Sequence, residues 1–271
     1  MNTTYSDRNI ESWVYSNWGE IVGNHRLKAF LQAMARSIVG PDKGQGINTL
    51  VLGSSRSGKT STVEFFVKTV LCWNLDHEKL QPCGQCQPCV QCAGRYELLD
   101  MDQILHGGLD HDVCFVPIDG NKFTQADIDQ AIDRANGRCG WRWIYYIDEI
   151  QGLVRRHLDH SLFKAVEQHK HVTWIVSTAT TKGLDPMFRN RFTEVATELP
   201  SVGELAPFIA RRCRVPGINI TWDDDTTLIR LAERSKQLTG LALKCLAQAK
   251  MFGSRLTREL VEQYAFEQID M

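Results

Sequence analysis

Residues 53–60 read Gly-Ser-Ser-Arg-Ser-Gly-Lys-Thr, and this stretch decides the fold. It matches the pattern G-x-x-x-x-G-K-[ST], a loop whose backbone N–H groups surround nucleotide phosphates. Residues 47–52 before it read as a short buried strand, and residues 61–71 after it read as a helix with one apolar face. Phosphate binding requires this order of elements, because the helix N-terminus adds partial positive charge. A glycine- and serine-rich turn that matches by chance is the alternative interpretation.

The loop and the start of the following helix form the predicted ATP-binding segment. Lys59 can reach the β- and γ-phosphates, and the hydroxyl of Thr60 can hold Mg²⁺. The residues that we expect to surround the phosphates are Gly53, Ser54, Ser55, Arg56, Ser57, Gly58, Lys59, Thr60 and Ser61.

Polar residues follow two later apolar runs, where strands of a parallel sheet would end. Asp148 and Glu149 come after residues 141–147; Asp148 would hold the magnesium shell, and Glu149 would orient or activate the attacking water. The alternative is an acidic pair that caps the next helix. Thr178 closes a predicted strand at 172–178, where it could contact the γ-phosphate or its water, or simply lie in a turn.

Five cysteines are concentrated in one segment, at about residues 72–92. Four of them repeat as C-x2-C-x2-C-x2-C, and thiolates at this spacing converge on a tetrahedral Zn²⁺ ion. The five are Cys72, Cys83, Cys86, Cys89 and Cys92, so one of them is surplus. An iron–sulfur cluster is the alternative, but the ferredoxin-type run ends in C-x3-C-P and this run does not. A closed four-cysteine site predicts a structural role. The scattered Cys114, Cys139, Cys213 and Cys245 are predicted core residues.

Composition limits the possible classes of protein. The chain has 271 residues, of which 43% are hydrophobic and 23% charged, with a net charge of −1. Coating of nucleic acid through bulk charge would require a more basic protein, so any DNA contact must be a local patch or be built from several subunits. No apolar run approaches the length of a membrane span, and the N-terminus lacks a secretory signal pattern. We therefore expect a cytoplasmic protein without membrane contact.

Apolar strands alternate with helices over residues 1–200, which predicts an α/β core with a parallel sheet covered on both faces. A further strand is predicted at 111–118, and helices are predicted at 124–135 and 158–168. Residues 201–271 show no strand pattern and predict a helical lid, with helices at about 203–213, 224–236, 240–251 and 256–269.

Four features, taken in order, resemble AAA+ ATPases, and more narrowly the ATPase subunits of bacterial replicative clamp loaders of the gamma/tau and delta-prime type. They are the opening motif at 18–24, the loop at 53–60, the cysteine segment and the acidic pair. The resemblance covers about residues 15–250. It implies that Ile21 and Val22 lie near the adenine, and that Arg191 reaches the γ-phosphate of a neighbouring subunit; a solvated basic turn is the alternative for Arg191.

The resemblance also implies a particular set of zinc ligands. By that match Cys72, Cys83, Cys86 and Cys89 bind the metal, and Cys92 is the extra thiol. The chain departs from the family in four places. The family's basic residue in a Tyr/Trp-Arg-Pro context before the opening motif is missing, since that stretch is Trp13-Val14-Tyr15 here. The Ser-Arg-Cys motif is Asn190-Arg191-Phe192 here, the lid's second sensor arginine aligns with Leu243, next to Lys244, and the helical collar domain of clamp-loader subunits is not recognisable.

The resemblance implies a DNA-dependent ATPase with ATP, Mg²⁺ and Zn²⁺ as cofactors. Such a protein would assemble with ATP as a homo- or hetero-oligomer of AAA+ subunits on duplex or primer–template DNA, with a sliding clamp as a candidate partner, and would release the DNA on hydrolysis. One alternative is a collarless AAA+ regulator, from a mobile element or phage, that marks DNA for a transposase-like partner. Another is a non-hydrolysing, nucleotide-binding scaffold.

Overall fold

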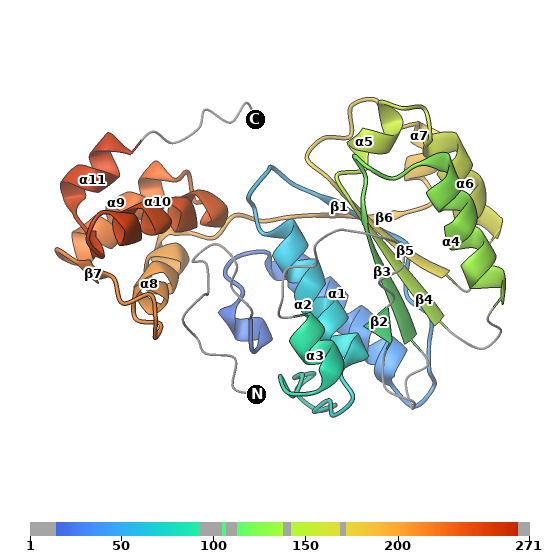
Figure 1. Ribbon diagram of the computed structural model, residues 1–271, viewed down its shortest axis with the longest axis horizontal. Coiled ribbons are helices and arrows are strands. Elements are labelled where there is room, and N and C mark those ends of the chain that lie inside the picture. Colours follow the sequence, from blue (N-terminus) through green and yellow to red (C-terminus); the bar gives the residue numbers. More distant parts are fainter. Residues whose placement is uncertain (1–14, 93–104, 107–112, 138–141, 169–171, 265–271) are drawn as a thin grey trace.

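A six-stranded sheet forms the centre of the larger part of the molecule (Figure 1). The computed structural model describes residues 15–92, 105–106, 113–137, 142–168 and 172–264. The strand order is β2-β3-β4-β5-β1-β6, and every neighbouring pair is parallel except β2 with β3. The strands are β1 (Thr49–Leu52), β2 (Leu105–His106), β3 (Val113–Asp119), β4 (Arg142–Asp148), β5 (Val172–Thr178) and β6 (Thr193–Ala196).

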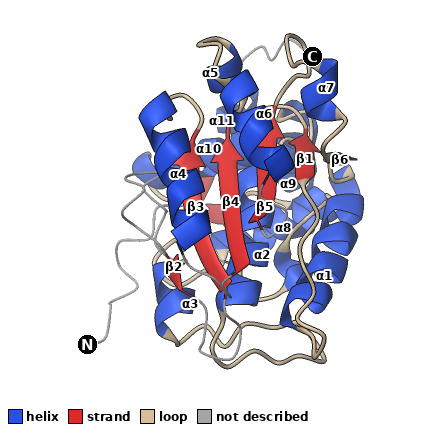
Figure 2. Ribbon diagram, turned by 90° about the vertical axis from the view of Figure 1, so that its right-hand side faces the viewer, coloured by secondary structure: helices blue, strands red, loops and turns tan. Residues whose placement is uncertain are grey.

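Helices cover both faces of this sheet (Figure 2). One face packs against α1 (His25–Val39) and α2 (Lys59–Leu71), and the other against α4 (Gln125–Gly137) and α6 (Asp159–Gln168). All seven residues of β5 are therefore buried, as are six of the seven in β4. Burial on both faces explains why these strands read as continuous apolar runs. The predicted parallel sheet with helices on both faces is confirmed.

The predicted elements of this part are present with small shifts at their ends. Asp148 is the last residue of β4 and does not follow the strand, because its backbone still pairs with Asp119 of β3. A short helix, α5 (Gln151–Val154), precedes α6, and another, α7 (Pro186–Arg189), precedes β6. Three of the four scattered cysteines, Cys114, Cys213 and Cys245, are buried as predicted. The fourth, at position 139, lies outside the described residues.

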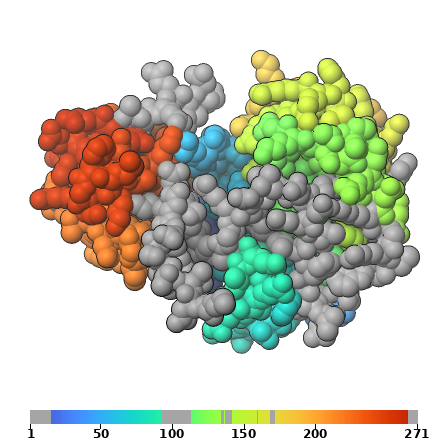
Figure 3. Space-filling model, viewed as in Figure 1, coloured from blue at the N-terminus to red at the C-terminus, as the bar shows by residue number. Residues whose placement is uncertain are grey.

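The C-terminal part is mainly helical and gathers at one end of the molecule (Figure 3). Its helices are α8 (Val202–Cys213), α9 (Asp225–Arg234), α10 (Thr239–Met251) and α11 (Arg258–Gln263). The prediction that this part has no strand was wrong, because β7 (Thr221–Trp222) pairs in parallel with β8 (Arg255–Leu256). Two-residue strands are too short to produce a periodic pattern. The helix predicted at 256–269 begins later and ends at Gln263, and residues 265–271 lie outside the described part.

The division of the chain near residue 200 stays a prediction, since one buried cluster contains side chains from both sides of it, among them Ile21, Leu205 and Leu246. Across the described residues, no helix is long and apolar enough to cross a membrane.

Candidate functional site

A cavity of about 220 Å³ opens between the loop of residues 53–60 and the start of α10. Its polar side presents Lys59, Thr60 and Glu149, and its apolar side consists of Tyr15, Ile21, Val22 and Leu243. The remaining lining residues are Asn24, Ser55, Arg56, Gly58, Ser61, Thr239 and Gly240. The structure thus brings most of the predicted ATP-binding residues to one cavity, while Gly53, Ser54 and Ser57 belong to the same loop without lining it.

The loop turns at a glycine directly into the N-terminus of α2. Gly58 has a φ of 87°, which favours glycine, and directly precedes α2. The ammonium group of Lys59 donates hydrogen bonds to the carbonyls of Gly53 (2.7 Å) and Ser54 (3.0 Å). Burial lowers the pKa of Lys59, and the nearby carboxylates of Glu149 and Asp148 oppose this shift. A phosphate group at this place would stabilise the charged form of Lys59 further.

Asp148 connects three elements of the site. Its carboxylate accepts a hydrogen bond from the Thr60 hydroxyl (2.9 Å) at the start of α2, and a very short one from the Ser177 hydroxyl on β5. Its side chain is buried, with a relative exposure of 8%. Mg²⁺ prefers oxygen ligands in octahedral geometry and is bound by one or two carboxylates together with substrate phosphates. The adjacent oxygens of Thr60 and Asp148 at the cavity fit that chemistry.

Glu149 is held by the side chain of Gln151, a residue for which the sequence pattern predicts no role. The amide nitrogen of Gln151 donates a very short hydrogen bond to the Glu149 carboxylate, and the amide oxygen of Gln151 lies 2.8 Å from the Thr178 hydroxyl. Glu149 itself has a φ of 58°, and its backbone N–H donates to Asp148 (3.1 Å). Gln151 therefore connects the two residues that were predicted to act on the γ-phosphate and its water.

Asn24 is a second site residue that was missed. Its side chain is almost fully buried; its amide nitrogen donates to the carbonyl of Ser57 (3.0 Å), and its amide oxygen accepts from the backbone of Glu198 (3.1 Å). Asn24 thereby ties the opening motif to the phosphate loop and to the segment after β6. The only sequence signal was its position at the end of that motif.

The structure places Arg191 away from this cavity. Its guanidinium forms a close ion pair with Glu167 of α6 and lies 5.4 Å from the centre of the Phe163 ring. In α10, Leu243 lines the cavity, while the neighbouring Lys244 does not. The start of α10 reaches the loop directly, since the N–H of Gly240 donates to the carbonyl of Arg56 (3.2 Å).

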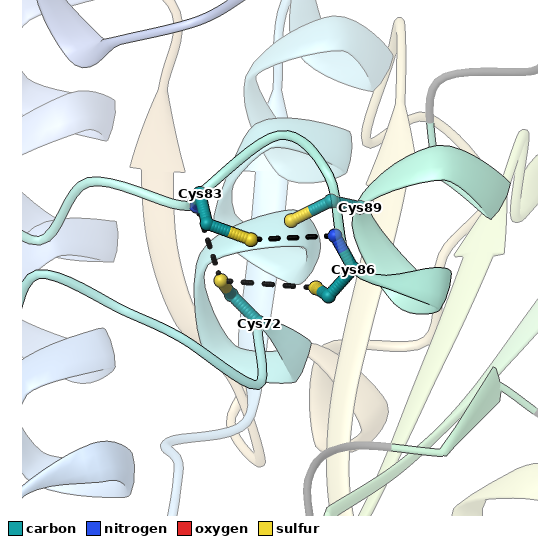
Figure 4. Close-up of side chains that lie close together, drawn as sticks. All are labelled: Cys72, Cys83, Cys86 and Cys89. Carbon is teal, nitrogen blue, oxygen red and sulfur yellow. Dashed lines mark hydrogen bonds between the residues drawn. The ribbon is translucent and has the colours of Figure 1, made fainter.

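Four cysteines converge at the far end of α2 (Figure 4). The sulfur atoms of Cys72, Cys83, Cys86 and Cys89 all lie within 4.8 Å of one another. Zn–S bonds of about 2.3 Å place the sulfurs of a tetrahedral site about 3.8 Å apart, so these four fit a zinc ion after small adjustments. Cys92 is buried nearby but does not belong to this group.

Hydrogen bonds prepare the cluster for a cation. The backbone N–H of Cys83 donates to the sulfur of Cys72 (3.2 Å), and that of Cys86 donates to the sulfur of Cys83 (3.3 Å). A hydrogen bond from the Cys89 thiol is the largest contribution that lowers the pKa of Cys72, to about 5. Thiolate character is what a metal ion requires of its cysteine ligands.

Comparisons with known proteins identify the fold. The sequence matches no known family profile and no curated protein. Among solved structures, the RuvB Holliday junction branch migration motor of Thermotoga maritima has a TM-score of 0.60 at 16% identity, and the match covers 92% of this chain and 71% of RuvB. The Orc1 protein of Aeropyrum pernix, solved in complex with DNA, has a TM-score of 0.56 at 16% identity over 90% of this chain and 65% of Orc1. The chain therefore has the α/β fold of AAA+ ATPases, with a cysteine cluster that could hold zinc.

The geometry of the cluster predicts which cysteine is dispensable. Replacing Cys89 by serine removes one of the four converging sulfurs, so we expect the protein to lose its zinc, as measured by metal analysis after purification. The matched variant Cys92→Ser should retain one zinc ion per chain. Equal zinc content in the two variants would contradict this ligand set.

Proposed function

We propose that this protein is a DNA-dependent AAA+ ATPase of the clamp-loader type, which assembles as an oligomer on DNA with ATP and releases the DNA on hydrolysis. The observation that carries the proposal is that Lys59, Thr60 and Glu149 line one cavity, and that the Thr60 hydroxyl donates to the Asp148 carboxylate directly behind it. A helix N-terminus, a buried ammonium and a carboxylate–hydroxyl pair are the groups that phosphoryl transfer needs.

Each group has a distinct task in this proposal. The loop N–H groups and Lys59 would bind the β- and γ-phosphates. Thr60 with Asp148 would hold Mg²⁺, which would supply positive charge next to the phosphates. Glu149 accepts a proton from the attacking water, and the Gln151 amide fixes the orientation of that carboxylate. Thr178, which contacts Gln151, is positioned at the end of β5 beside the phosphate loop, where its carbonyl accepts from the N–H of Gly53 (3.1 Å).

Completion of the site requires a second subunit. A guanidinium at the γ-phosphate stabilises charge that develops in the transition state, and no arginine other than Arg56 lines the cavity among the described residues. Arg191 lies on a different surface and is partly exposed, with 47% of its side chain accessible. An oligomer in which Arg191 leaves Glu167 and reaches the neighbour's nucleotide would complete the site. RuvB is described as a motor acting on Holliday junctions and Orc1 was solved with DNA, which supports DNA as the partner here.

The decisive experiment is the steady-state ATPase rate per subunit, measured against protein concentration with primer–template DNA, blunt duplex or no DNA. Composite sites predict a rate that rises with concentration, and the clamp-loader type predicts selective stimulation by the primer–template junction. Equal stimulation by any duplex would instead favour the regulator that marks DNA for a transposase-like partner. ATP binding without turnover in every condition would contradict the proposal and favour the scaffold.

The same titration tests the role of Arg191. Arg191→Ala should lose activity by about a thousandfold, because the arginine acts on the transition state. Mixing it with Glu149→Gln, which keeps Arg191 but lacks the base, should restore part of the rate. The control is Arg189→Ala, whose side chain pairs with Glu194 at 2.7 Å on the same segment and should leave the rate unchanged. Failure of the mixture to recover would contradict action between subunits.

Gln151 provides a separate prediction about hydrolysis. Gln151→Ala removes the donor that orients Glu149, so kcat should fall about tenfold while the Kd for ATP stays the same, since Gln151 does not line the cavity. Gln151→His keeps both a donor and an acceptor and should restore much of the rate. Loss of ATP affinity equal to the loss of kcat would show that Gln151 supports only the local structure.

A further inference from the structure

The cysteine cluster closes a short loop, residues 73–82, at both ends. Cys72 precedes the loop and Cys83 follows it, and their sulfur atoms belong to the same group. Within the loop, the backbones of Asp76 and Gln81 pair in an antiparallel bridge, and the Asp76 carboxylate accepts from the N–H of Lys79 (3.0 Å). A metal ion bound by the four sulfurs would therefore fix the path of this loop.

The loop binds the indole ring of Trp18. The indole N–H of Trp18 donates to the carbonyl of Leu80 at 3.2 Å, and both residues are buried, with relative exposures of 7% and 1%. Leu80 has a φ of 50°, a backbone conformation that a leucine rarely adopts. The Trp18 ring also packs edge-to-face on Phe65 of α2, with 4.9 Å between ring centres.

The segment that contains Trp18 forms the apolar wall of the nucleotide cavity. Ile21 and Val22 line the cavity three and four residues later, and the Ile21 carbonyl accepts from the ammonium of Lys28 (2.7 Å). Tyr15, on the other side of Trp18, lines the same cavity, and its ring contacts Phe65 edge-on at 6.5 Å between centres. Anchoring Trp18 therefore fixes both ends of the segment that forms this wall.

We propose that the metal centre holds the 73–82 loop and, through Trp18, shapes the wall that receives the nucleotide base. The inference rests on the proposed binding of ATP in this cavity. The phosphates bind at the other end of α2, and the 13 residues of that helix separate the two ends by about 20 Å. The effect should therefore concern the base and spare the phosphates.

The test compares ATP with inorganic tripolyphosphate, which presents the phosphates without a base. Trp18→Phe keeps an aromatic ring on Phe65 but removes the N–H donor to Leu80. We expect it to weaken ATP binding about three- to tenfold, the loss expected for one buried hydrogen bond, and to leave tripolyphosphate binding unchanged in calorimetric titrations. The matched control is Trp73→Phe. Trp73 lies in the same loop but is 46% exposed, so this variant should bind ATP like the unaltered protein.

Removal of the metal gives an independent readout. Removing zinc with a chelator should weaken ATP binding to the unaltered protein by about the same factor as Trp18→Phe does. In Trp18→Phe itself chelation should add little, because zinc removal and the substitution both act through the contact between Trp18 and Leu80. Coupling between two binding sites is reciprocal: if zinc strengthens ATP binding, ATP must strengthen zinc binding. ATP should therefore slow the release of zinc to a chelator, and tripolyphosphate should not.

Several results would overturn the inference. The inference is contradicted if Trp18→Phe binds ATP with unchanged affinity. It is also contradicted if the affinities for ATP and for tripolyphosphate fall by the same factor. If the metal-free protein unfolds, as judged by circular dichroism, the folded Trp18→Phe variant decides the question. Absence of binding of either ligand to the unaltered protein would refute the proposed function itself, which is a distinguishable outcome.

Discussion

The hydrogen bond between Thr60 and Asp148 is the contact on which the rest of the site depends. It joins the first turn of α2 to the last residue of β4, and β5 lies between β4 and β1 in the sheet. Ser177 of β5 donates to the other oxygen of the Asp148 carboxylate. Parallel strands that end at one edge of the sheet bring a hydroxyl, a carboxylate and a glycine-rich loop together at that edge.

The two functional sites share α2 as a common element. Its N-terminus carries the phosphate loop, and its C-terminus leads into Cys72, so the polypeptide that positions Lys59 also positions the cysteine cluster. Helix α10 contacts the same loop, where the backbone N–H of Gly240 donates to the carbonyl of Arg56. Two separate elements therefore contact the parts that line the cavity: the start of α10 through Arg56, and the loop between Cys72 and Cys83 through Trp18.

The sequence predicts those parts of the site that lie in short, contiguous patterns. The loop at 53–60, the acidic pair and a cysteine site within 72–92 could be predicted, because the chemistry of phosphate and zinc constrains positions close together in the chain. The spacing alone left one of the five cysteines surplus, and the structure groups Cys72, Cys83, Cys86 and Cys89. Gln151 and Asn24 could not be assigned, since their roles arise from contacts between distant segments that leave no periodic signal. The β7–β8 pair was missed for a related reason, because each strand has two residues and is stabilised only by its partner.

Binding of ATP in the presence and absence of Mg²⁺, followed by calorimetry, tests the central claim most directly. The account predicts that Mg²⁺ strengthens ATP binding at least tenfold in the unaltered protein. In Asp148→Asn, Mg²⁺ should add nothing, while the Mg²⁺-free affinity is kept, because the phosphate loop remains intact. An unaltered protein that binds ATP equally well without Mg²⁺, or an Asp148→Asn variant with the full Mg²⁺ effect, would contradict the assignment of this cavity as the ATP·Mg²⁺ site.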